Sequence, residues 1–233
     1  MIRIIYLIGI AITVSLFVAA TLQAQEQPLD FNCGDTLMDK RDGNLYPTVL
    51  IGDQCWIAWN LNAGRQVNDM RQYNNRYIEK TCYNNMPENC NIYGGLYTWH
   101  EAMGYPEQTE ESRDICPEGW HVPTKQEWEE LVNHLGEKDA GQQMKVTAQH
   151  EPSWDGNNTS GFTALPAGNA YEEKFGRQHM FALFWSATPA DENYAWFSQL
   201  DNFWYPAPPK YKELYIGNYF LKTNGFSVRC LRD

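Results

Sequence analysis

The six cysteines are the residues of this chain whose chemistry is easiest to foresee. One of them, Cys116, opens the stretch CPEGWHVPTKQEW, just ahead of a tryptophan turn and a helix start. A partner cysteine could fasten that helix to a distant part of the chain, whereas a reactive cysteine could do chemistry there. An even number of cysteines in an exported chain is typical of disulfide bonds. The six are Cys33, Cys55, Cys82, Cys90, Cys116 and Cys230.

The histidines form no catalytic or metal-binding pattern in the sequence. They are dispersed, and neither His-Glu-x-x-His nor Cys-x-x-Cys occurs. We interpret His121, in the Trp-His-Val-Pro turn, as a packed structural residue. Glu127 is explained as part of a helix cap, and Glu129 and Glu130 as a solvated helix face. The sequence therefore predicts no catalytic residue and favours a protein that is not an enzyme.

The first 24 residues have the layout of a secretory signal peptide. Arg3 supplies a positive start, residues 4–20 are almost unbroken apolar sequence, and Leu22-Gln23-Ala24 ends in a small residue. An uncleaved membrane anchor is the alternative, but 17 apolar residues are at the short limit for spanning a bilayer. We expect cleavage after Ala24 and no transmembrane segment in the mature protein. The expected location is extracellular or on the outer surface of a bacterium.

The mature chain is strongly acidic. Residues 1–24 contain one arginine and no acidic residue, so their removal leaves 17 basic against 29 acidic residues, a net charge of −12. Such a surface repels nucleic acid and anionic membranes. It could attract cations or basic partners, although solubility is the simpler interpretation. Aromatic residues make up 14% of the chain, a high share that needs an explanation.

Strand and turn signals dominate the sequence outside two helices. Asp42-Gly43 and Gly52-Asp53 are hairpin signals on either side of a β-rich run at residues 46–51. Residues 64–92 hold many asparagines and few apolar residues, which predicts a long surface loop. Three further strands are predicted from β-branched and aromatic content, at residues 180–188, 194–200 and 225–233.

Alternation divides the predicted closing strand into two faces. Alternate residues of a strand share a face. One face carries Phe226, Val228 and Cys230, and the other carries Ser227, Arg229 and Leu231. The pair Val228 and Cys230 suits a buried face.

Two helices are predicted. In residues 93–103, three apolar residues share one helical face after a Gly-Gly break, namely Leu96, Trp99 and Met103. The second helix is better marked, because Thr124 and Glu127 form a capping box and Gly136 is a C-terminal stop. Its apolar residues follow at helical spacing, namely Trp128, Leu131, Val132 and Leu135.

Three groups of segments together resemble one family. They are DGNLYPTVLIGDQCWIAWNLN, then YGGLYTWHEAM with CPEGWHVPTKQEWEEL, then SGFTALPAG with FWSAT, AWFSQL and GFSVRCLRD. They look like the Fibrobacter succinogenes major paralogous domain of exported bacterial proteins, over residues 36–233, after a polar lead-in at 25–35. That family is similar to the C-type-lectin-like fold of formylglycine-generating enzymes. The resemblance implies a single disulfide-stapled α+β domain with short antiparallel sheets, two main helices, long loops, and N- and C-terminal strands that meet.

The resemblance also implies how the cysteines pair. In such a fold the segment before the main helix lies near the final strand, which pairs Cys116 with Cys230. That bond closes a loop of over a hundred residues and is worth about 4–5 kcal/mol by chain-entropy arithmetic. The other expected pairs are Cys82 with Cys90, across their short loop, and Cys33 with Cys55, the two that remain. Cys116 is then a fastener.

A formylglycine-generating oxidase is the enzyme that the resemblance offers. Such enzymes use copper-bound cysteines in the C-terminal part of the domain to oxidise a substrate cysteine. A Cu(I) site needs at least two free sulfurs placed together. The C-terminal half offers only Cys230, with Cys116 as its expected partner, so this activity is the least favoured of three functions considered.

The segment EPSWDGNN at residues 151–158 is the first candidate ligand site. Sugar sites commonly combine an aromatic plate with side chains that grip hydroxyl groups, roles for Trp154, Asp155 and Asn157. Calcium-dependent lectins carry Glu-Pro-Asn in such a loop, whereas this chain has Glu-Pro-Ser and no following Trp-Asn-Asp. Glu151, Asp155 and Asn157 could supply some of the six to eight oxygens that calcium needs. The same residues also make an ordinary turn.

The segment LDNFWYPAPPKY at residues 200–211 is the second candidate site. Three consecutive aromatic residues, Phe203, Trp204 and Tyr205, cannot all point inward, so at least one is expected at the surface. A small core beneath this loop is the alternative. By contrast, four tryptophans in the family motifs are expected in the core, namely Trp120, Trp128, Trp185 and Trp196.

These observations favour a secreted or cell-surface binding module that recognises a glycan or a partner protein. The loops near 151–159 and 200–211 are expected to hold the ligand. The alternative is a structural or adhesion component of the bacterial cell envelope without a small-molecule ligand. Nucleic acid is not expected as a partner, and calcium is the one cofactor considered.

Overall fold

The domain begins with a β-meander built on two tight turns. β1 (Thr36–Met38) pairs with β2 (Leu45–Ile51), and β2 pairs with β3 (Gln54–Ile57), both antiparallel. Gly43 and Gly52 have φ angles of 77° and 61°, in the left-handed region that favours glycine. Both predicted hairpin turns are therefore confirmed.

The computed structural model describes residues 31–68, 70–106, 113–172, 174–201 and 215–233. Residues 31–233 form one structural unit. The predicted signal peptide and most of the predicted lead-in lie outside the described residues, as do Phe203, Trp204 and Tyr205. In the part of the chain that the structure describes, no helix has the length and apolar character of a membrane span.

The remaining elements are mostly short, and the longest are one helix in the middle of the chain and two strands beyond it. Through the middle of the chain they are β4 (Arg65–Gln66), β5 (Glu79–Lys80), the 3-10 helix η1 (Tyr83–Asn85), α1 (Pro87–Tyr93), α2 (Trp99–Ala102), β6 (Trp120–His121) and α3 (Lys125–Leu135). Beyond α3 they are α4 (Ala140–Met144), β7 (Asn169–Tyr171), β8 (Lys174–Gly176), β9 (Phe181–Pro189), β10 (Tyr194–Asp201), β11 (Tyr215–Leu221) and β12 (Leu231–Arg232).

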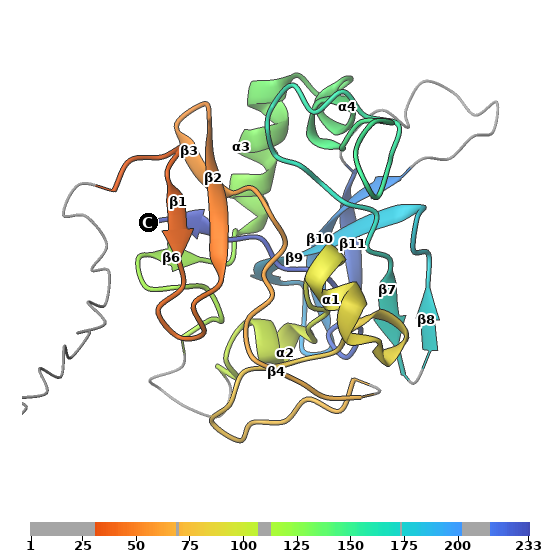
Figure 1. Cartoon of the computed structure of the whole chain (residues 1–233). Coiled ribbons are helices and arrows are strands. Elements are labelled where there is room, and N and C mark those ends of the chain that lie inside the picture. The colour runs from red at the N-terminus through yellow and green to blue at the C-terminus, as the bar shows by residue number, and fades with distance from the viewer. Residues whose placement is uncertain (1–30, 69, 107–112, 173, 202–214) are drawn as a thin grey trace, which may run out of the picture. The chain divides into compact units, whose positions relative to one another are not determined.

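The last strand closes the domain against the first ones. β12 lies between β3 and β6 in a five-stranded sheet of order β1-β2-β3-β12-β6. Leu231 is opposite both Trp56 of β3 and His121 of β6. The blue strand at the C-terminus accordingly lies beside the orange meander in Figure 1. The expected meeting of N- and C-terminal strands is confirmed.

A second antiparallel sheet, of order β11-β10-β9, is joined to the first by α3. Trp128 of α3 stacks on Phe184 of β9 with ring centroids 5.6 Å apart, and lies 4.8 Å from Trp56 of β3. These three rings are fully buried, so one aromatic cluster ties the helix to both sheets. Two small sheets, the parallel pair β4-β5 and the antiparallel pair β7-β8, complete an α+β fold.

The main helix begins where the sequence places it. The Thr124 hydroxyl accepts the Glu127 N–H at 3.3 Å, and the Glu127 carboxylate accepts the Thr124 N–H at 2.7 Å. This capping box satisfies backbone groups that the first helical turn leaves without partners. The apolar stripe packs inward, with Trp128, Leu131 and Val132 buried.

The first predicted helix is shorter than expected. Between the end of α1 at Tyr93 and residue 103 only α2 is helical, because Leu96 instead exchanges two backbone hydrogen bonds of 2.9 Å with Thr81. The Thr98 side chain caps α2 by accepting the Glu101 N–H at 3.2 Å. The predicted surface loop at 64–92 is also partly wrong. It contains β4, β5 and α1, and α1 starts at a proline, which is favourable in the first helical turn.

The predicted burial of Val228 and Cys230 is confirmed, and the opposite face of the closing segment is buried as well. Ser227 and Arg229 are as inaccessible as Val228, because this segment runs between the two sheets. The Arg229 guanidinium donates to the Asn60 side chain and to the carbonyls of Ile57, Phe162 and Thr163, at 2.7–3.0 Å. Burial lowers the pKa of Arg229 well below its ordinary value.

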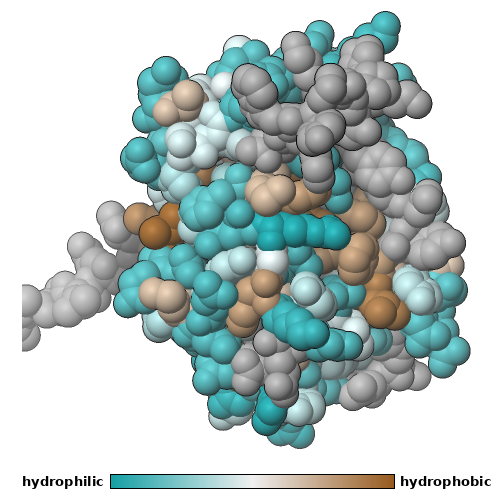
Figure 2. Space-filling view, turned by 90° about the vertical axis from the view of Figure 1, so that its right-hand side faces the viewer, coloured by the Kyte–Doolittle hydropathy of each residue, from teal (hydrophilic) through white to brown (hydrophobic). Residues whose placement is uncertain are grey.

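All three predicted disulfides are present. Cα–Cα distances are 5.7 Å for Cys33–Cys55, 5.0 Å for Cys82–Cys90 and 5.8 Å for Cys116–Cys230. The core tryptophans also agree with the prediction for Trp120, Trp128 and Trp185, whereas Trp196 is half-buried with the Lys125 ammonium 4.5 Å from its ring. Figure 2 shows a face on which hydrophilic residues predominate and hydrophobic ones gather in small patches.

Candidate functional site

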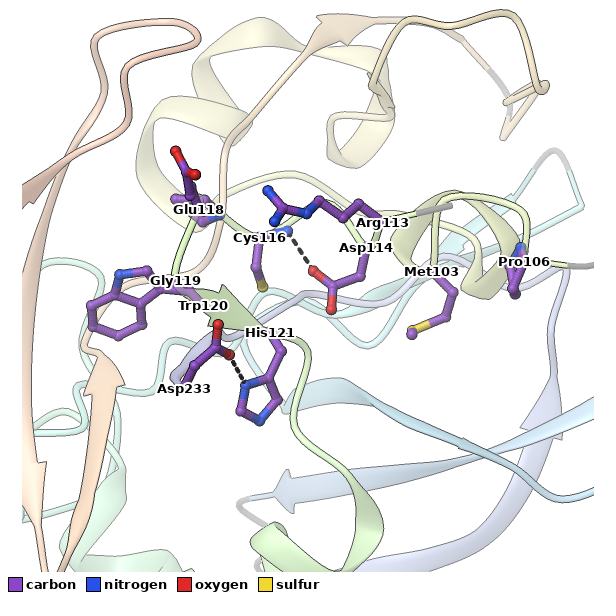
Figure 3. A pocket seen from close by; sticks show the side chains of 11 residues that line it. Met103, Pro106, Arg113, Asp114, Cys116, Glu118, Gly119, Trp120, His121 and Asp233 are labelled. Atoms are coloured by element: carbon purple, nitrogen blue, oxygen red, sulfur yellow. Dashed lines mark hydrogen bonds and ion pairs between the residues drawn. The ribbon is translucent and has the colours of Figure 1, made fainter. Parts of the chain in front are cut away.

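A cleft of about 430 Å³ opens beside the disulfide between Cys116 and Cys230. Most of its wall comes from the chain that turns before and through β6, which the disulfide holds against the closing segment. In Figure 3, Asp114 and Cys116 lie near the middle of the view, with the His121–Asp233 pair below them. The lining residues are Met103, Pro106, Arg113, Asp114, Cys116, Pro117, Glu118, Gly119, Trp120, His121 and Asp233.

His121 is held between two carboxylates. Its Nε2 lies 3.0 Å from Oε1 of Glu127, and its Nδ1 lies 2.7 Å from Oδ1 of Asp233. The hydrogen bond to Glu127, joined by the one to Asp233 and opposed by burial, raises the pKa of His121 to about 9. The imidazole is therefore protonated at neutral pH and both nitrogens donate. In that state the ring cannot accept a proton as a general base. We call this group the His121 clamp.

Asp114 supports the turn ahead of β6. Its two carboxylate oxygens accept the N–H groups of Cys116 and Val122, each at 2.9 Å. Burial outweighs these hydrogen bonds and raises the pKa of Asp114. The carboxylate positions the disulfide-bearing turn and the first residues of β6, so its contacts are those of a structural residue at the cleft floor.

The first candidate loop, at 151–158, is arranged differently from the sequence expectation. Trp154 is only 5% exposed and belongs to the buried core, so its ring is not available as a plate for a sugar. Oδ1 of Asn157 accepts the N–H and the hydroxyl of Thr159, at 3.1 and 3.0 Å. Glu151 is exposed, and Asp155 makes an ion pair with Lys145.

Lys145, just after α4, connects the two candidate loops. Its Nζ lies 2.8 Å from Oδ1 of Asp155 and donates to the carbonyl oxygen of Asp201 at 3.0 Å. The ammonium also lies 5.2 Å from the centroid of the Trp154 ring. Lys145 is buried, whereas Asp155 is exposed. Lys145 therefore links residues 151–158 to Asp201, the last residue of β10, where the second candidate segment begins.

Two of the three residues considered for calcium have other partners in the structure. The Asp155 carboxylate is engaged by the Lys145 ammonium, and Asn157 by Thr159. Among the described residues, no group of three or more His, Cys, Asp or Glu side chains is placed to hold a metal ion. A buried ammonium thus occupies the electrostatic position beside Asp155 that a cation would need.

Two features of these sites were missed by reasoning from the sequence. His121 was expected to be a packed structural residue, yet it lies in a charged clamp whose second partner, Asp233, is 112 residues away. Glu127 was recognised from the sequence only as part of a helix cap, and nothing in the sequence indicated that it also contacts His121. Lys145 carries no motif at all, because its partners are set by how α4 and β10 pack.

Comparison with known proteins gives one match. The family model described as the Fibrobacter succinogenes major domain matches residues 49–232. Neither the curated proteins nor the solved structures include a match to this chain.

Proposed function

The chain belongs to the Fibrobacter succinogenes major domain family, and from that premise we propose that it is a non-enzymatic module that binds a glycan or a partner protein outside the cytoplasm. The three disulfides place the folded domain in an oxidising compartment, because cytoplasmic thiols are kept reduced. An exported protein at or beyond the cell surface is the specific form of this proposal.

A role without catalysis is supported by the chemistry of the cysteines and of the cleft. All six cysteines are paired, so the two free sulfurs that a copper-thiolate oxidase needs are not available. The His121 imidazolium is not a general base at neutral pH. What remains in the cleft is a set of hydrogen-bonding groups beside Met103 and Trp120, which suits recognition.

A C-type-lectin-like arrangement is the finer part of the proposal. It is supported by the closing strand β12, which pairs with the N-terminal meander, and by loops placed after the main helix. It is also supported by the way the closing segment joins both sheets, since the Trp185 N–H of β9 donates to the Ser227 carbonyl.

The observation that carries the proposed function is the Lys145 junction. One buried ammonium contacts both Asp155 and the carbonyl of Asp201 at the end of β10, so the first candidate loop and the described start of the second candidate segment share one support. Loops held by a rigid scaffold are common positions for binding residues. Because the ammonium already neutralises Asp155, we expect ligand binding without calcium.

A glycan array probed with and without calcium tests this function. We expect hits that are the same with calcium and with chelator, and that weaken in Asp155→Ala or Trp204→Ala variants whose melting curves stay normal. Calcium-dependent hits would contradict the Lys145 argument. No hit on any glycan, together with no captured protein ligand, would favour the alternative of a structural or adhesion component of the cell envelope.

A thiol count tests the absence of catalysis by cysteine. The unreduced protein, unfolded in denaturant, is expected to show no reactive thiol. Two or more free thiols per chain would instead support an oxidase of the formylglycine-generating type.

A further inference from the structure

Residues 65–80 form a basic segment in an acidic protein. They contain four basic and two acidic residues, whereas the rest of the chain contains 14 basic and 27 acidic ones. The parallel pair β4-β5 joins the two ends of this segment. In Figure 1 it is the gold loop that extends along the lower edge of the domain. We call residues 65–80 the tyrosine–arginine loop.

The loop presents aromatic rings next to guanidinium groups. Tyr73 and Tyr77 are 62% and 64% exposed. The Arg65 guanidinium carbon lies 4.7 Å from the centroid of the Tyr77 ring. Arg76, the residue before Tyr77, is exposed as well. Exposed aromatic residues of this kind commonly mark a binding surface.

Buried polar groups hold the loop in one conformation. Glu79 is buried and accepts hydrogen bonds from the Arg65 guanidinium at 2.6 Å, from the Asn75 amide at 2.9 Å and from the Tyr73 N–H at 2.9 Å. The N–H of Glu79 itself donates to Glu101 of α2 at 2.9 Å. A single carboxylate therefore fixes the start, the middle and the end of the loop.

Gln72 adds a second attachment to the body of the domain. Its amide donates to the Leu96 carbonyl at 2.9 Å and accepts the Thr98 N–H at 2.7 Å. Arg76 is held at a φ of 70°, which is unfavourable for a residue other than glycine. Such strained positions occur where the surrounding structure imposes them, often at binding sites. The exposed side chains thus lie on a pre-organised frame, which lowers the entropic cost of binding.

We propose that the tyrosine–arginine loop is a docking site for an anionic glycan, one that carries carboxylate or sulfate groups. This inference goes beyond the proposed function, because it names a ligand class and a second surface besides the loops around Lys145. Arginine guanidinium groups form bidentate, charge-assisted hydrogen bonds with such anions. The exposed faces of Tyr73 and Tyr77 offer flat apolar surfaces to sugar rings between the charged groups.

Other classes of polyanion fit this surface less well. A nucleic acid duplex would bring many phosphates close to the acidic remainder of the chain and would be repelled. A protein partner usually buries about 800 Å² on each side, and the exposed apolar surface of this loop consists mainly of two tyrosine rings. A flexible glycan chain can contact the loop alone.

The binding test uses three oligosaccharides of equal length, one carboxylated, one sulfated and one neutral. Binding of each to the full mature protein is measured by calorimetry at low and at high salt. We expect at least one anionic oligosaccharide to bind, and its affinity to fall as salt screens the charges. The neutral oligosaccharide is expected not to bind at the loop. Comparison of the two anionic probes tells carboxylate from sulfate recognition.

Two variants of the loop have matched controls elsewhere in the chain. Arg76→Asn removes the guanidinium while asparagine tolerates positive φ, and its control is Arg177→Asn, at an exposed arginine with a φ of 64°. Tyr77→Ala is matched by Tyr171→Ala, at another exposed tyrosine. We expect affinity to fall about tenfold in Arg76→Asn and about fivefold in Tyr77→Ala. Both controls should stay within about twofold of the unchanged protein.

The possible results separate this inference from the proposed function. Anionic glycans that bind all four variants like the unchanged protein would overturn the docking site and leave the binding function standing. Binding of neutral glycans alone would also overturn it. Binding of an acidic polypeptide, lost in Arg76→Asn while no glycan binds, would assign the loop to a protein partner. In that case the glycan part of both proposals would fail.

Discussion

Two groups of contacts rely on a residue with a raised pKa, but for opposite reasons. One is the His121 clamp, and the other, which we call the anchor, consists of Glu101 of α2 with the Glu79 N–H and the Tyr105 hydroxyl. At the clamp, the hydrogen bonds that the charged imidazolium donates to Glu127 and Asp233 stabilise it and raise the pKa of His121 to about 9. At the anchor, burial disfavours the charged carboxylate and raises the pKa of Glu101 to about 7, although the Glu79 N–H and the Tyr105 hydroxyl donate to it.

This difference shows that a raised pKa alone does not tell whether the folded protein stabilises or destabilises the charged form of a group. In both cases the folded state binds a proton more tightly than the unfolded state, so stability falls as pH rises. For Glu101 the loss runs from its ordinary value of 4.5 to about 7. For His121 it runs from 6.5 to about 9. At neutral pH the folded protein therefore still has a protonated His121, whereas Glu101 is already partly ionised.

Removal of a disulfide beside each region should give the largest effects. Cys116 and Cys230 lie next to the clamp, and replacing both by serine should lower the free energy of unfolding by about 4–5 kcal/mol, because a long loop is opened. Replacing Cys82 and Cys90, which lie between Glu79 and Glu101 in the sequence, opens a short loop and should cost about 2.5 kcal/mol. Urea unfolding at pH 7 measures both. An equal loss from the two pairs would show that loop length does not set the order.

Glu101→Gln should strengthen the anchor at neutral and higher pH. The glutamine oxygen can accept the Glu79 N–H, and the glutamine NH2 can donate to the Tyr105 hydroxyl oxygen, without a buried charge. The variant should therefore gain about 1–2 kcal/mol at pH 8 and little at pH 4.5. Urea unfolding across this pH range measures the difference, with the exposed Glu137→Gln as control. A variant that is less stable than the unchanged protein at pH 8 would mean that the charged carboxylate is the stabilising form.

His121→Gln should destabilise the protein at neutral pH, in contrast to Glu101→Gln. The variant loses the charged contacts with Glu127 and Asp233, which should cost about 1 kcal/mol at pH 6–7 because solvent partly screens them. Above about pH 10 the unchanged histidine is neutral, so no loss is expected there. Thermal unfolding at both pH values checks this, with the exposed His134→Gln as control. A pH-independent loss would assign His121 a packing role only.

Tyr105→Phe should give the smallest change and refine the account of the anchor. The Tyr105 hydroxyl donates to Glu101 at 2.8 Å, so its removal should cost about 0.5–1 kcal/mol. The charged carboxylate loses a donor, and the pKa of Glu101 should rise further. The pH titration of unfolding then extends to higher pH. A titration that does not move would indicate that burial alone controls Glu101.

Much of the fold was predictable because its signals are local. The capping box of α3 lies within four residues, and both hairpin turns depend on glycines at single positions. The prediction for residues 93–103 was wrong because helical spacing alone could not show that Leu96 pairs with Thr81. The disulfide pairing was predicted from the resemblance to a family rather than from the residues alone.

The candidate site was predicted less well. Tryptophan is a residue type that stacks on sugars, yet Trp154 is buried, because its ring packs in the core near the Lys145 ammonium. The loop at 64–92 was predicted to lie at the surface, but nothing in its composition showed that Glu79 would be buried and would organise it.

The sequence by itself indicated that the cysteines of an exported chain would form disulfides. It also determined the acidic character of the chain, the position of the main helix and the meander that precedes it. These follow from composition and from contacts between residues a few positions apart. Only the tertiary structure decided which polar groups contact one another, such as His121 with Asp233, Lys145 with Asp155, and the Glu79 N–H with Glu101. The partners in such groups come from elements that meet only when the sheets and helices pack, so no pattern of neighbouring residues in the sequence could reveal them.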